Sequence, residues 1–133
     1  MNKLPWMVAG VAVVALGVVL GRPRMGLAAG HHPKPRPGIT AERVLPRAMV
    51  PANPNTLAAY EAARRVPQVL DGIYCYCNCS KSIGHRSLLT CFESNHASGC
   101  DICMGEAMMA AEMTSGGKSL AQIRKAIDEK FGD

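Results

Sequence analysis

Apolar side chains recur at helical spacing in several segments of this 133-residue chain, and no segment alternates as a strand would. Leu120, Ile123 and Ile127 lie on one face of the last such segment. Ser119 and Gln122 at its start have the spacing of a capping box. The pattern predicts an all-α fold, a small bundle of three to four short helices behind an N-terminal apolar segment.

Two helices are expected in the first half of this bundle. Asn53 or Asn55 can cap the first one, and Pro67 limits or kinks it because proline interrupts the backbone hydrogen-bond ladder. A second, short helix is expected over residues 87–92.

Another helix is expected to begin near Ser98, since Ser98 and Asp101 have capping-box spacing with Asp in place of Glu or Gln. It is expected to run to about Met113, before Gly116 and Gly117 interrupt it.

The chain begins with an uncharged apolar run over residues 6–20, preceded by Lys3. Its length lies between the core of a signal peptide and a spanning helix of about 20 residues. We interpret residues 1–29 as a signal peptide or membrane anchor. We therefore expect the rest of the chain to be extracytoplasmic, in the periplasm or at the cell surface, with the membrane as a partner through this segment.

Residues 30–54 carry six prolines, a composition typical of an extended, semi-rigid spacer, and His31-His32 at its start are interpreted as incidental. Residues 55–133 form the expected cysteine-rich domain. The net charge of +5 arises entirely before residue 55, where seven Lys/Arg face one acid, whereas eight Lys/Arg face nine acids after it. The cysteine-rich domain therefore has no basic surface for nucleic acid, and we expect no nucleic-acid partner.

All six cysteines lie within 29 residues, and three of them alternate along the chain. They are Cys75, Cys77, Cys79, Cys91, Cys100 and Cys103. Thiols at this density are typical of soft-metal binding, of redox chemistry or of a disulfide-stapled domain. Each of the first three cysteines could form a disulfide with one of the last three. A disulfide-stapled interaction module without metal is therefore an alternative.

The spacing favours a site shared by two parts of the chain. A Cys-x-Cys pair can chelate one ion, whereas a disulfide within it would be strained. Asn78 tolerates a left-handed turn, which would let Cys77 and Cys79 face a common point. Cys100 and Cys103 lie at the expected start of a helix, where the helix dipole lowers a thiol pKa. A lowered thiol pKa favours metal-bound thiolates, and it also favours a thiol-disulfide oxidoreductase that uses Cys100 and Cys103. Whether the protein is an enzyme is therefore uncertain, and we do not favour that interpretation.

The neighbouring residues favour Cu(I). Met104 and Met108 follow the last cysteine pair on its helix, and thioethers are ligands for Cu(I) that Zn(II) sites rarely use. His96 lies between Cys91 and Cys100 and is a further candidate ligand. Six thiols exceed the four that one tetrahedral zinc ion needs, whereas a polynuclear cuprous cluster would use them all. Zn(II) or another thiophilic metal is the alternative.

These residues resemble the PCYCGC-motif family of exported bacterial proteins. The resemblance rests on residues 75–79, 87–92, 100–103 and 123–131, with Tyr74 where the family has Pro and Asn78 where it has Gly. It implies export and a bound-metal or thiol role. A weaker similarity is to the thiol-reducing subunit of cytochrome c maturation. We expect a membrane-tethered protein for metal storage, handling or delivery, with a metal donor or acceptor protein as a partner.

Overall fold

The computed structural model describes residues 31–132, and within this range every regular element is helical, which confirms the all-α expectation. The six α-helices are α1 (Pro54–Arg65), α2 (Pro67–Leu70), α3 (Cys79–Ser82), α4 (Leu88–Phe92), α5 (Asp101–Ser115) and α6 (Leu120–Phe131). Short 3-10 turns span Ala41–Arg43, Arg47–Met49 and His96–Gly99. The apolar run expected to act as a signal or anchor lies outside the described residues. Among those residues, no helix combines the length and apolarity needed to cross a membrane.

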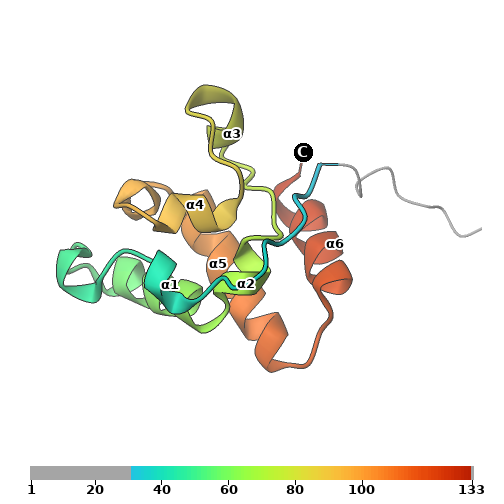
Figure 1. Cartoon of the computed structure of the whole chain (residues 1–133), viewed down its shortest axis with the longest axis horizontal. Coiled ribbons are helices and arrows are strands. Elements are labelled where there is room, and N and C mark those ends of the chain that lie inside the picture. The colour runs from blue at the N-terminus through green and yellow to red at the C-terminus, as the bar shows by residue number, and fades with distance from the viewer. Residues whose placement is uncertain (1–30, 133) are drawn as a thin grey trace, which may run out of the picture.

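Helix α5 is the centre of the fold, with α1 packed along one side of it and α6 along another (Figure 1). Small side chains dominate the buried faces of α1 and α5, which allows the two backbones to approach closely. The buried alanines are Ala59, Ala62 and Ala63 on α1 and Ala107, Ala110 and Ala111 on α5. Tyr60 of α1 meets Phe92 of α4 edge to face, with ring centroids 4.9 Å apart.

Most helix ends lie where the local sequence signals predict them. The Asn53 side chain caps α1 by accepting hydrogen bonds from the amides of Asn55 and Thr56 at 2.9 and 3.3 Å. The capping box of Ser119 and Gln122 opens α6. Pro54 occupies the first turn of α1, where the missing amide hydrogen costs nothing.

The expected start of α5 was wrong. Ser98 lies in a 3-10 turn, and its hydroxyl donates to the carbonyl of Asn95 at 2.6 Å, so it does not cap the helix. Cys100 is the capping residue instead, and its Sγ accepts from the amide of Cys103 at 3.4 Å. Because the Ser98 hydroxyl bonds within the turn before α5, the helix cap lies two residues further along the chain.

The proline-rich segment before α1 contacts the helices and contains two of the 3-10 turns. Val44 and Val50 are buried in the core. Arg36 forms an ion pair with Asp71, with Nη2 and Oδ1 2.7 Å apart. A side chain at Gly72 would meet Pro35 at 2.7 Å, so the glycine permits this segment to lie close to the backbone after α2. Residues 31–53 therefore form one side of the domain.

Candidate metal centre

Cys75 and Cys77 lie on the loop between α2 and α3, and Cys79 is the first residue of α3. The amide of Leu88 donates to the carbonyl of Ile73 at 2.8 Å, which closes the base of the segment formed by this loop and α3. Asn78 has a φ of 61°, the only positive φ among the described non-glycine residues, as the turn prediction required. The left-handed residue reverses the chain and begins α3 at Cys79.

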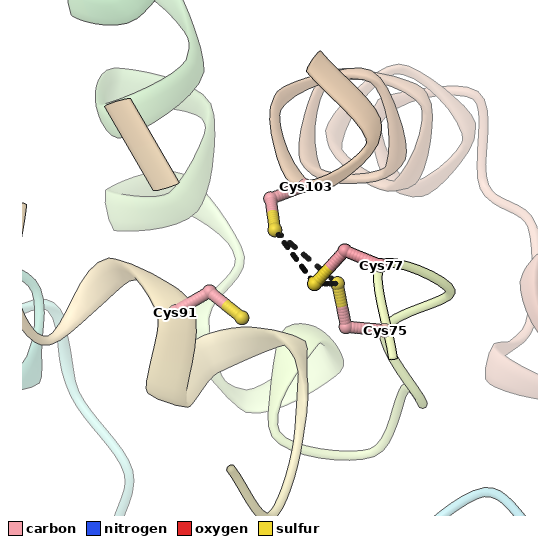
Figure 2. A group of neighbouring side chains, drawn as sticks. All are labelled: Cys75, Cys77, Cys91 and Cys103. Atoms are coloured by element: carbon pink, nitrogen blue, oxygen red, sulfur yellow. Dashed lines mark hydrogen bonds between the residues drawn. The ribbon is translucent and has the colours of Figure 1, made fainter. Parts of the chain in front are cut away.

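Four sulfur atoms converge between this loop and two helices (Figure 2). They belong to Cys75 and Cys77 on the loop, Cys91 on α4 and Cys103 on α5. The Sγ of Cys75 lies 3.3 Å from those of both Cys77 and Cys103, and Cys77 and Cys103 are 3.5 Å apart. Four thiolates around one tetrahedral ion at about 2.3 Å would be about 3.8 Å apart. The sulfurs are thus close to ligand spacing, and all six cysteines are free thiols.

A second group of possible ligands overlaps the first. It consists of Cys77, Cys79, Cys91 and His96, whose ligand atoms lie within 4.8 Å of one another. The Sγ atoms of Cys79 and Cys91 are 3.3 Å apart. The structure therefore brings five of the six predicted thiols and the predicted histidine into two adjoining groups, which share Cys77 and Cys91.

Cys100 belongs to neither group. Its thiol caps α5, while Cys103, three residues further, faces the other sulfurs. Cys103 is fully buried; the hydrogen bond with Cys75 lowers its pKa, but contact with Cys91 and burial together outweigh that effect, so the pKa is raised. A working thiol of an oxidoreductase needs exposure and a lowered pKa, and Cys103 has neither.

Cys77 is the exception among the clustered thiols. It is half-buried, and burial by itself would raise its pKa. Hydrogen bonds from the thiols of Cys79 and Cys75 and from the Cys79 amide stabilise the thiolate and lower the pKa to about 6. Cys75 has a raised pKa, because its thiol hydrogen-bonds to Cys103 and is buried. One thiolate is thus available near the surface, and the thiols behind it are protonated until an ion displaces their protons.

Glu106 is a buried residue that the sequence did not single out. Its side chain is on α5, one turn after Cys103, and is fully buried. Oε1 accepts a hydrogen bond from the Tyr76 amide at 3.0 Å, and Oε2 has no hydrogen-bond partner. Burial raises the pKa of this carboxyl to about 7, against the opposing hydrogen bonds from Cys75 and Tyr76. A glutamate in a helix is ordinarily exposed, so no pattern in the sequence would have indicated its position.

Met104 and Met108, the secondary candidates, lie on other faces of α5. A helix advances about 100° per residue, so Met104 and Met108 point about 100° and 140° away from Cys103. Met104 is buried in the core, whereas Met108 is 38% exposed. His85 lies beside the sulfurs instead, with Nδ1 3.3 Å from the Sγ of Cys91, and its ring packs edge to face on His96.

His31, His32 and Asp128 form a third group whose polar atoms converge. His32 Nδ1 accepts a hydrogen bond from the Tyr74 amide at 3.0 Å, so the proton of the neutral ring is on Nε2. Nε2 donates that proton to Asp128 Oδ1 at 2.8 Å. A metal at Nε2 would require this nitrogen to lose its proton, and the His32 ring would then have no N–H group. That arrangement is unfavourable. This group therefore joins His31 and His32 to α6 through Asp128.

Fold and site define the class: a small helical, cysteine-rich protein whose clustered thiols can hold a thiophilic metal ion. The chain belongs to the family described as "Protein of unknown function with PCYCGC motif", which matches residues 38–133. The match begins well before the thiols, at Gly38, and so includes the segment that packs beside α1. Comparison with curated proteins and with solved structures gave no significant match. The similarity to the cytochrome c maturation subunit gained no support from these comparisons.

Proposed function

We propose that this protein binds Cu(I) or a similarly thiophilic ion and holds it for storage, handling or delivery. The observation that supports this is the convergence of the Cys75, Cys77, Cys91 and Cys103 sulfurs from three separate elements. Buried thiols packed only for core stability have no need to meet one another, whereas a metal site requires it.

The donor set is soft throughout the first group, since it contains sulfur alone. Cu(I) and Zn(II) both accept thiolates, but Cu(I) is the softer ion and also accepts clusters with more sulfurs than one tetrahedral site holds. The near contact of Cys79 with the first group supplies such an extra sulfur. This preference does not depend on Met104 or Met108.

We further propose that the domain acts outside the cytoplasm, tethered to the membrane. The uncharged apolar run over residues 6–20 supports this location. Fractionation of cells that carry the full-length chain tests it, and recovery in the cytosolic fraction would contradict it. In this location a donor or acceptor protein would exchange the ion through the half-buried Cys77.

An anaerobic Cu(I) titration of the reduced full-length protein tests metal binding. A thiolate-to-copper charge-transfer band in the ultraviolet is expected to grow and then saturate. The matched variant Cys91→Ser is expected to lower its amplitude, because Cys91 lies in both groups. Absence of the band in the wild-type protein would overturn the proposal. Intact mass before and after reduction separates the disulfide alternative, since each disulfide gains two hydrogens on reduction.

A further inference from the structure

Two ligand groups side by side raise the question of how many ions the centre holds. Cys75 and Cys103 belong only to the first group, and Cys79 and His96 belong only to the second. Cys77 and Cys91 belong to both. One tetrahedral ion in the first group would leave Cys79 and His96 next to it without a ligand role, although Cys79 is 3.3 Å from Cys91.

We propose that the centre is binuclear, with the thiolates of Cys77 and Cys91 bridging two thiophilic ions. This inference rests on the proposed function, and it deepens it by assigning stoichiometry and connectivity. Cys75 and Cys103 complete the coordination of one ion, and Cys79 and His96 complete that of the other. Six donors then give each ion four ligands, the number that a closed structural site requires.

The charge of the centre supports a second ion. Metal binding deprotonates the thiols, so five thiolates place five negative charges in a largely buried region beside Glu106. One Cu(I) ion would leave four of those charges uncompensated and two would leave three, whereas one divalent ion such as cadmium leaves three and two leave one. Buried charge without compensation is costly, so a second ion in the centre lowers that cost.

The positions of the two bridging residues also suit the role. Cys91 lies on α4 and belongs to both groups, with His85 Nδ1 3.3 Å from its Sγ, so an imidazole N–H can orient a thiolate that faces two ions. Cys77 precedes the left-handed Asn78, and it shares the first group with Cys75, whose Sγ is 3.3 Å away, and the second group with Cys79. The alternating motif thus supplies a terminal ligand, a bridge and a second terminal ligand in sequence order.

Cadmium-113 is the probe for this connectivity, since it is thiophilic and has a nuclear spin. The reduced full-length protein, in detergent and without oxygen, is titrated with cadmium-113 ions alone. Native mass spectrometry is expected to show two cadmium ions per chain. The cadmium spectrum is expected to show two resonances, each split by coupling through the shared thiolates. One bound ion, or two resonances without splitting, would overturn the inference.

Two cysteine variants locate the ions. Cys79→Ser is expected to reduce the stoichiometry from two ions to one and to leave a single, unsplit resonance. Cys100→Ser is the matched control, because Cys100 lies in neither group, and it is expected to keep two coupled ions. The assignment is overturned if the Cys100 variant loses an ion and the Cys79 variant keeps both.

The outcomes separate this inference from the proposed function on which it rests. A single ion with four sulfur ligands would refute the binuclear centre and leave metal binding intact. A protein that binds neither cadmium nor Cu(I) would refute both. The wild-type spectrum decides between these outcomes even where a variant fails to fold.

Discussion

Glu106 Oε1 accepts a hydrogen bond from the amide of Tyr76 at 3.0 Å, and this bond joins α5 to the middle of the thiol loop. Tyr76 stands between Cys75 and Cys77, so the contact fixes the loop against the helix that carries Cys103. The carboxyl is fully buried and its Oε2 is unpaired, which makes its ionised form costly.

This contact predicts a pH dependence for the metal-free, reduced protein. The carboxyl pKa rises from 4.5 to about 7 on folding, so the folded state binds more protons than the unfolded state between these values. Stability is therefore expected to fall as pH rises from 4.5 to 7, by about 3 kcal/mol at most from this group. Above pH 7 its contribution is expected to level off.

Glu106→Gln is expected to remove this slope, because the amide does not ionise. Denaturant unfolding at a series of pH values measures it. Glu112→Gln is the matched control on the same helix, since Glu112 is exposed, and it is expected to keep the wild-type slope. Equal slopes in the wild type and the Glu106 variant would contradict the prediction.

Asp71 joins the proline-rich segment to the helices and predicts a large loss on substitution. Its carboxylate is fully buried and accepts from Arg36 Nη2 at 2.7 Å, Arg86 Nη1 at 2.9 Å and the Arg36 amide at 2.7 Å. Asp71→Asn removes the buried anion that Arg36 and Arg86 share, leaves Arg36 only Glu93 at 3.7 Å, and is expected to cost about 3–5 kcal/mol.

An exposed ion pair provides the comparison for Asp71. Glu61 pairs with Arg47 at 2.8 Å, and its side chain is 39% exposed. Glu61→Gln is expected to change the free energy of unfolding by less than about 1 kcal/mol. Urea unfolding followed by circular dichroism compares the two variants. Similar losses in both would show that residues 31–53 are not held through Asp71.

The features that the sequence predicted are local ones. The Asn53 cap, the Ser119 capping box and the left-handed Asn78 each depend on a few neighbouring residues, and all three occur in the structure. The start of α5 was misplaced because a 3-10 turn before it competes for Ser98. That competition depends on how the turn packs, with Ala97 fully buried, and spacing alone does not contain this information.

The site was predictable as a set of thiols but not as an arrangement. The close spacing of the six cysteines along the chain indicated a thiol site, and the structure brings five of them together. The position of Cys100 at a helix cap, and the burial of Glu106 and Asp71, arise from contacts between residues far apart in sequence. Charged side chains are usually exposed, so no sequence pattern indicated that either carboxylate is buried.

Asn78 predicts different outcomes for two substitutions at one position. Its φ of 61° is accessible to glycine without strain but disfavours a β-branched side chain. Asn78→Gly is expected to leave the free energy of unfolding within about 0.5 kcal/mol of the wild type. Asn78→Val is expected to lose about 1–2 kcal/mol.

The same strain is expected to weaken metal binding. The turn must be closed for Cys77 and Cys79 to face the other ligands, so about 1.4 kcal/mol of strain lowers affinity about tenfold. Competition titration with a Cu(I) chelator measures this for both variants. A valine variant that binds as tightly as the glycine variant would show that the turn does not position the thiols.

The two serines with capping-box spacing give the last prediction. The Ser119 hydroxyl accepts from the Gln122 amide at 3.3 Å, and Gln122 Oε1 accepts from the Ser119 amide at 2.9 Å. Ser119→Ala is expected to cost about 1 kcal/mol, because the first turn of α6 loses its cap.

Ser98→Ala is the control for this cap, since Ser98 has the same spacing to Asp101 but caps no helix. It loses one solvent-exposed hydrogen bond to the Asn95 carbonyl and is expected to change stability by less than about 0.5 kcal/mol. Thermal unfolding of both variants measures the difference, with metal stoichiometry unchanged in each. A larger loss from Ser98→Ala than from Ser119→Ala would restore Ser98 as the cap of α5 and move Cys100 out of that role.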